Sequence, residues 1–318
     1  MKYRQRGFTL IELLITLLLS SVVIAGVSQA FLQSRKSFTQ QQALSFISED
    51  GRYAIEVLTQ ELRRAGFLVN AQRNDAGYSK AEIFAADANA STSGIAFAAS
   101  EDIQGSYSAS GFNGLVNDIN HLVFRYQLDP AGTCTDSANP NVPPTVVNKA
   151  ECLANNYTWT QTATDLDAGN SPCSAQVSDQ NGGAQAATTK TIYFLVTGTA
   201  TEPTLSCYAE SSLKDGTVVN NNGGASMPLV SNVEAMYVLY GEDTDSDKAA
   251  NRYVIASSVT NWQKVVSVRV SLVLRSSETN ISTASTTSYT IDGTSYNVKN
   301  PNDKRLYRVF TTTVAFRN

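Results

Sequence analysis

The strongest constraint on the fold is a long apolar segment close to the amino terminus. From Phe8 to Leu32 the side chains are apolar or small apart from Glu12 and Gln29, and about 20 such residues suffice for a helix to cross a bilayer. Three basic residues precede this segment. Since positive charge stays on the cytoplasmic side, the chain after Arg35 is expected to lie outside the cytoplasm. The sequence therefore predicts one membrane-spanning helix, residues 8–32, followed by a large periplasmic or extracellular part.

The junction between the basic leader and the apolar segment reads Gly-Phe-Thr-Leu-Ile-Glu, from Gly7 to Glu12. An ordinary secretory signal has a shorter apolar core, with its cleavage site after that core. Here the expected cut lies between Gly7 and Phe8, which removes residues 1–7 and leaves the helix on the mature protein. An ionised carboxylate such as Glu12 costs on the order of 3 kcal/mol inside a bilayer and usually marks function.

This junction resembles the class III signal peptide of type IV prepilins, in which Gly precedes the cut, Phe follows it and Glu is fifth in the mature chain. The resemblance implies that a prepilin peptidase and methyltransferase removes the leader and N-methylates Phe8. It also implies that Glu12 of an incoming subunit pairs with the terminal amine of a neighbour and sets its axial register. The alternative interpretation of Glu12 is a chance polar residue at the membrane interface.

The helical pattern continues beyond the membrane segment. Apolar and small residues recur at steps of three and four from Leu44 to Ala65, and Gly66 is a stop signal. One helix from Phe8 to about Ala65 would be roughly 85 Å long, more than any bilayer requires. Its outer half, 33–66, should therefore lay an apolar stripe on a globular domain. Gly26 and Gly51 are the expected places for a kink.

After Gly66 the hydrophobic period shifts towards two, and the segments rich in β-branched and aromatic residues predict strands. Val265–Leu274 alternates apolar with polar residues, as in an antiparallel strand with one covered face. The expected fold is α+β and pilin-like, with the long helix packed on an antiparallel sheet formed by residues 67–318. The predicted strands are 94–99, 119–128, 191–197, 233–240, 265–274, 288–298 and 306–316.

Four cysteines lie in or near a polar middle region, about 131–210: Cys134, Cys152, Cys173 and Cys207. An even count in an oxidising compartment predicts two disulfides rather than free thiols. Three pairings are open, and the sequential one closes the shorter loops. We expect these bonds to staple the middle region into an excursion from the sheet.

Several segments near the carboxyl terminus resemble minor pilins of the PilW family: 233–241, 242–247, 252–253, 262–270 and 308–318. The resemblance implies a low-abundance subunit that primes pilus assembly at the inner membrane and lies at or near the fibre tip. Its implied partners are the major pilin, other minor pilins and a large PilY-type adhesin. Such a subunit spans the inner membrane once before assembly and is on the cell-surface pilus afterwards. The alternatives are a minor pseudopilin of a type II secretion system and a membrane-tethered adhesin.

The stretch Asp243-x-Asp245-x-Asp247 resembles the start of an EF-hand calcium loop, with Asn251 at the ninth position. Lys248 stands where that loop has its glycine. The twelfth position is Val254 instead of a bidentate Glu, so Glu242 or backbone carbonyls would have to complete the ligand shell. The alternative is a solvated acidic loop without metal.

Neither composition nor motifs favour nucleic-acid binding or catalysis. A net charge of −4 argues against nucleic acid as a partner. The sole histidine, His121, falls in a strand pattern, where a structural imidazole is more common than a base. No candidate nucleophile and no pair of carboxylates has the sequence spacing typical of a catalytic motif. We therefore expect a structural subunit without a cofactor, unless calcium binds, and no enzyme.

Overall fold

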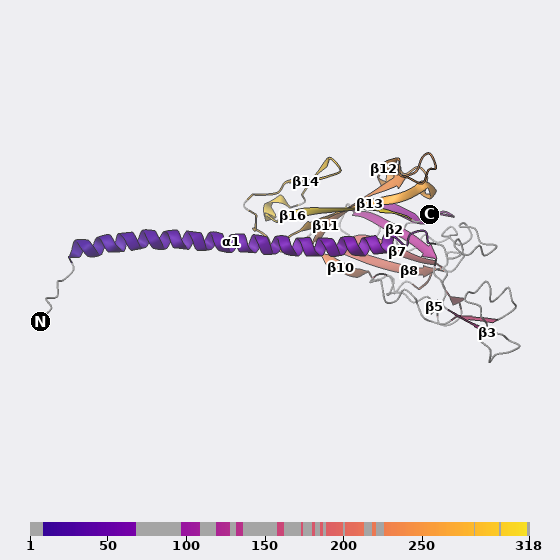
Figure 1. The fold of residues 1–318 in the computed structure, drawn as a ribbon, viewed down its shortest axis with the longest axis horizontal. Helices are drawn as coiled ribbons and strands as arrows, with labels where there is room; N and C mark the ends of the chain where they lie inside the picture. Colours follow the sequence, from indigo (N-terminus) through magenta and orange to yellow (C-terminus); the bar gives the residue numbers. More distant parts are fainter. Residues whose placement is uncertain are drawn as a thin grey trace.

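The computed structural model consists of one long helix joined to a body of antiparallel sheets (Figure 1). It describes residues 9–67, 97–108, 119–127, 132–135, 158–161, 173, 180–181, 185–186, 189–199, 201–212, 218–220, 226–282, 284–298 and 300–316.

Helix α1, Leu10–Leu62, is continuous over 53 residues, as predicted. It begins after Thr9, whose backbone is extended, and the chain turns away at Gly66, where φ is +73°. Neither Gly26 nor Gly51 interrupts it. Figure 1 shows the first half of α1 projecting from the body, with the amino terminus at the far end. The second half packs on the body because its apolar residues recur on one face. That buried face consists of Ile47, Gly51, Ala54, Val57, Leu58, Glu61 and Leu62.

The larger sheet has six strands within the described residues, and all of its pairings are antiparallel. The order is β1-β2-β7-β8-β10, with β9 beside β8. The strands are β1 Ile103–Ser108, β2 Ile119–Gln127, β7 Thr189–Gly198, β8 Pro203–Ser212, β9 Val218–Asn220 and β10 Met227–Ser231.

The second sheet has the order β12-β11-β13-β16 and is also antiparallel. Its strands are β11 Val233–Glu242, β12 Arg252–Val254, β13 Val265–Arg275 and β16 Tyr307–Ala315. The prediction of one covered face for β13 is wrong, because nearly every residue of the strand is buried. One face lies in the main core, and Val273 on the other packs under a small hairpin of β14, Ser288–Ile291, and β15, Thr294–Asn297.

One hydrophobic core joins α1 to both sheets. It contains Leu58 and Leu62 of the helix, Phe194 of the larger sheet, and Val268 and Leu272 of the smaller sheet, all at most 1% exposed. Because the helix contributes to the same core as the sheets, its outer half is part of the body and not a separate stalk.

Some sequence predictions need correction. The predicted strand 288–298 is the β14–β15 hairpin, whose turn at Asp292-Gly293 has positive φ at both residues, as a two-residue hairpin turn requires. Residues 97–99 of the predicted strand 94–99 are not in a strand. The excursion expected at about 131–210 extends too far, because residues from Thr189 onward form β7 and β8 of the main sheet.

Short two-stranded ladders lie within the middle region: β3 Gly132–Thr135 with β4 Thr158–Gln161, and β5 Gln180–Asn181 with β6 Gln185–Ala186. Three short 3-10 helices complete the described elements: η4 Ala256–Ser258, η5 Trp262–Lys264 and η6 Pro301–Asp303.

Cys173 and Cys207 form a disulfide, as predicted, with a Cα–Cα distance of 5.8 Å. Cys207 lies in β8 and both cysteines are buried in the main core, so the bond ties the middle region to the sheet. Cys152 lies outside the described residues, and its pairing with Cys134 stays a prediction.

Candidate functional site

The amino-terminal half of α1 is apolar and fully uncovered. It is the one helix in the described part of the chain that is long and apolar enough to cross a membrane, and none of its most apolar stretch is buried. Leu10, Leu18 and Ile24 are each at least 65% exposed. Such a surface requires either lipid or the helices of other subunits around it.

Glu12 lies in the first turn of α1, where its backbone N–H donates to the carbonyl of Thr9 at 3.1 Å. It is exposed among apolar neighbours. A carboxylate at this end of a helix is favoured by the helix dipole, whose positive end is the amino terminus. Gly7 and Phe8 lie outside the described residues, so the predicted cleavage and N-methylation are not tested.

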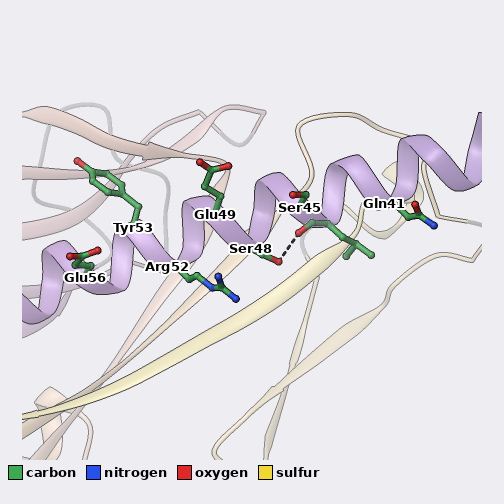
Figure 2. A pocket seen from close by; sticks show the side chains of 8 residues that line it. Gln41, Ser45, Ser48, Glu49, Arg52, Tyr53 and Glu56 are labelled. Atoms are coloured by element: carbon green, nitrogen blue, oxygen red, sulfur yellow. Dashed lines mark hydrogen bonds between the residues drawn. The ribbon is translucent and has the colours of Figure 1, made fainter.

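The outer half of α1 is fixed to the body by polar contacts as well as by its apolar stripe. Gln40 Nε2 donates to the carbonyl of Ile281 at 2.6 Å, and Arg308 Nη1 donates to Ser48 Oγ at 2.7 Å. Figure 2 shows a shallow groove along this part of the helix. It is lined by Gln41, Leu44, Ser45, Ser48, Glu49, Arg52, Tyr53 and Glu56.

The acidic loop connects β11 to β12 and brings the three predicted carboxylates together. Oxygens of Asp243, Asp245 and Asp247 lie within 4.8 Å of one another. Asp243 is buried, whereas the other two are exposed. Its Oδ1 accepts from the backbone N–H of Ser246 at 2.5 Å, and its Oδ2 accepts from that of Lys248 at 2.8 Å. Desolvation raises the pKa of Asp243, but these backbone hydrogen bonds outweigh it and hold the pKa below its ordinary value.

Lys248 adopts the backbone conformation that the EF-hand loop assigns to glycine, with φ at +68°. The lysine therefore does not prevent the sharp turn. Asn251, the other predicted ligand, has its side chain engaged within the loop. Its Oδ1 accepts from the backbone N–H of Thr244 at 2.6 Å, and its Nδ2 donates to Asp245 Oδ2 at 3.1 Å.

Glu242 is engaged away from these aspartates, which leaves backbone carbonyls as the other expected source of ligands. Its carboxylate is 1% exposed and lies 2.7 Å from Arg252 Nη2. It also accepts from the backbone N–H and the hydroxyl of Thr260. Desolvation raises the pKa of Glu242, but the hydrogen bonds from Thr260, Arg252 and Asn261 lower it below the ordinary value. The sequence did not predict this role for Glu242. The available signal was a charged residue at the end of a largely apolar strand.

His121 is buried in β2, and burial lowers the pKa of its imidazole. It has no other histidine to act with, and the acidic loop is the one group of three His, Cys, Asp or Glu with metal-site spacing in the described residues. The structure gives His121 the position of a core residue.

Comparison with protein families gives two matches. Residues 2–28 match the prokaryotic N-terminal methylation motif. Residues 192–318 match the type IV pilus-assembly protein W, PilW. The chain therefore carries a prepilin motif at its amino terminus and a carboxyl-terminal part similar to the PilW family. No curated protein and no solved structure matches it.

The PilW match begins in β7 and extends through both sheets to β16, including the acidic loop and Cys207. The methylation motif includes Gly7, Phe8 and Glu12. Together they make the chain a membrane-anchored minor pilin of a type IV pilus, a structural assembly protein whose partners include other pilins and a prepilin peptidase.

Proposed function

We propose that this protein primes type IV pilus assembly and is incorporated at or near the pilus tip. The observation that supports this proposal is the presence of the methylation motif and the PilW match on one chain. The size of the body supports a low copy number. A domain of residues 67–318 is bulky for a part repeated along a thin fibre.

The uncovered half of α1 serves the protein in two settings. Before assembly it spans the inner membrane once, with the body in the periplasm. After the cut between Gly7 and Phe8, the same surface packs among the helices of the major pilin and the other minor pilins. Glu12 then pairs with the methylated terminal amine of a neighbouring subunit, because a carboxylate removed from water requires a cation. A PilY-type adhesin is the further partner at the tip.

The first experiment tests processing. Gly7→Ala or a bulkier change should impair removal of the leader, and mass spectrometry of the membrane-extracted protein measures the mature amino terminus. A mature chain that starts well after Leu32 would contradict the proposal, because the apolar segment would then be a conventional signal.

The second experiment tests priming. The gene is deleted in a strain that cannot retract its pili, and surface pili are counted with and without the wild-type gene restored. We expect far fewer pili in the deletion strain, while protein export through type II secretion continues. Normal pilus numbers with lost secretion would instead favour a pseudopilin.

We also propose that the acidic loop binds calcium through Asp243, Asp245 and Asp247. The convergence of their oxygens and the glycine-like backbone of Lys248 support this. The loop lacks a bidentate ligand at Val254, and two of its aspartates are exposed, so the affinity should resemble that of extracellular modules, with Kd about 10⁻⁴–10⁻³ M.

A further inference from the structure

Strand β16 presents a long, unprotected edge. It is the last strand of the second sheet, and it pairs with β13 over nine residues without a shift in register. Its sequence, Tyr-Arg-Val-Phe-Thr-Thr-Thr-Val-Ala, contains no proline and only residues that favour strands, apart from one arginine and one alanine.

Two of the other edge strands, β12 and β10, carry devices that normally prevent strand addition. Strand β12 has only three residues. Strand β10 contains Pro228 and a register shift between Pro228 and Val230. In contrast, β16 has neither a proline, a bulge nor a lysine.

The hydrogen-bond pattern shows which residues of β16 point outward. The backbone N–H of Phe316 donates to the carbonyl of Val266, and that of Ser276 donates to the carbonyl of Leu306, both at 2.9 Å. Since bonded and non-bonded pairs alternate in an antiparallel ladder, the even-numbered residues of β16 bond to β13. The backbone N–H and C=O groups of the odd-numbered residues therefore point away from the sheet. These residues are Tyr307, Val309, Thr311, Thr313 and Ala315.

Nothing in the described part of the chain covers these outward groups. Within the described residues no backbone or side-chain hydrogen bond to them is present, and Thr311, Thr313 and Ala315 are exposed. The edge is therefore open from Thr311 to Ala315, whereas Tyr307 and Val309 are partly buried beside the β14–β15 hairpin.

The helix groove runs beside this open edge. The even-numbered side chains of β16 face α1, because Arg308 contacts Ser48 and the ring of Phe310 lies against Gly51. The side chains of an added strand would alternate in the same way, and every second one would enter the groove.

Two arginines lie where the groove meets β16, Arg52 in the lining and Arg308 on the strand, although the lining also contains Glu49 and Glu56. Arg52 and Arg308 are exposed, and neither guanidinium lies within ion-pairing distance of a carboxylate in the described part of the chain. In Figure 2 the side chains of Arg52 and Glu49 point away from each other, and both line the groove. An incoming strand with an Asp or Glu among its groove-facing residues would complement these two arginines.

A second copy of this chain does not fit the edge. The contacts of Ser48 with Arg308 and of Gly51 with Phe310 show that β16 runs in the same direction as α1. Antiparallel self-pairing would turn one α1 end for end, although both amino termini belong in one membrane. Parallel self-pairing about a two-fold axis would place each outward N–H opposite the same N–H of the other copy.

We propose that an extended segment of a different pilin subunit adds to β16 as a further strand, with an acidic side chain directed at Arg52 and Arg308. The inference rests on the proposed function, which brings this chain together with other pilins. It specifies the surface by which the body recognises its neighbour, independently of the contacts made by α1 in the membrane.

The test uses the full-length chain in the deletion strain, with a benzoyl-phenylalanine photo-crosslinker at Thr313. The matched control carries the same crosslinker at Ser257, an exposed position away from the edge. Illumination should join Thr313, but not Ser257, to one other prepilin. Mass spectrometry of the crosslinked peptide should identify an extended segment that contains Asp or Glu.

Two variants then separate edge pairing from mere proximity. Thr311→Pro and Thr311→Ala both remove the hydroxyl that contacts Ser271 Oγ, but only proline removes the outward N–H. We expect Thr311→Pro to reduce the adduct at least about tenfold and Thr311→Ala to retain it, since each 1.4 kcal/mol of binding is tenfold in affinity. Arg52→Glu should also reduce the adduct, whereas Arg63→Glu, at an exposed site just after the end of α1, should not.

Thermal melting shows whether Thr311→Pro folds, and if it does not, the Arg52→Glu variant decides. The inference is overturned if the wild-type chain restores pili but Thr313 gives no adduct, or gives one with a second copy or a lipid. The inference is also overturned if Thr311→Pro gives an undiminished adduct, or, where Thr311→Pro does not fold, if Arg52→Glu does. If the wild-type gene leaves pilus number unchanged, the proposed function fails instead.

Discussion

At Gly51 the helix and the sheet approach closely, and substitution of this glycine by alanine tests that packing. A Cβ atom at Gly51 would lie 2.6 Å from Cδ2 of Phe310 and closer still to Cε2 and Cζ of the same ring. Ordinary contacts between carbon atoms are about 3.5–4.0 Å. The ring must therefore move, and Phe310 is only partly buried, so it has room to do so.

Two opposing effects set the size of the change. Alanine favours the helix over glycine by about 1 kcal/mol. Overpacking in a well-packed region costs about 1–3 kcal/mol. We expect Gly51→Ala to lower the free energy of unfolding by about 1 kcal/mol, which for a body of this size lowers Tm by about 2–4 °C.

The assay is thermal unfolding of the full chain in detergent micelles, followed by tryptophan fluorescence. Gly26→Ala is the matched control, because nothing lies within 4 Å of a Cβ there and the site is outside the body. Its Tm should stay unchanged. Adding Phe310→Leu to Gly51→Ala should recover part of the loss. A rise in Tm for Gly51→Ala would refute the reasoning, since helix propensity would then act without the clash.

Further predictions concern the other sites. Glu12→Ala should leave membrane insertion intact or easier, because the desolvation cost is removed, yet reduce piliation; full restoration of pili by this variant would contradict the amine pairing. Calcium chelation should lower the Tm of the full chain, and Asp245→Ala should abolish that difference; no shift at millimolar calcium would favour a metal-free loop. Because the folded-state pKa of Glu242 lies below its ordinary 4.5, the stabilisation it provides is present above that pH and is lost as the pH falls through the folded-state pKa; Glu242→Gln should flatten this dependence in acid titrations of Tm. Replacing Cys173 and Cys207 by serine should cost about 2–4 kcal/mol of stability, measured by denaturant unfolding.

The sequence predicted the elements whose burial follows a simple period. Helix α1 is continuous because its apolar residues recur at helical spacing, and β11, β13 and β16 follow from runs of β-branched and aromatic residues. In the acidic loop, the convergence of three aspartates could be expected from their spacing, but the left-handed backbone at Lys248 could not, because lysine rarely adopts it.

The misses have physical causes as well. Strand β8 was not predicted because its buried residues include polar ones. Glu210 is 2% exposed and is held there by hydrogen bonds from the hydroxyls of Tyr193 and Tyr208, both at 2.8 Å. Tyr208 lies in β8 itself, but Tyr193 belongs to the neighbouring strand β7, and its contribution leaves no local pattern. From the sequence, Gly51 was only a place where the helix could kink, whereas its lack of a side chain serves the contact with Phe310, which is far away in the sequence.

That separation also affects how the protein reaches its final state during synthesis. Ser48 and Arg308, which join α1 to β16, are 260 positions apart. The segment that forms α1 is synthesised long before β16. Until β16 arrives, β13 lacks one of its two neighbours and the ring of Phe310 is missing from the helix surface at Gly51. The body can therefore be completed only after β16 has been synthesised, and until then the apolar stripe of α1 is open to other contacts.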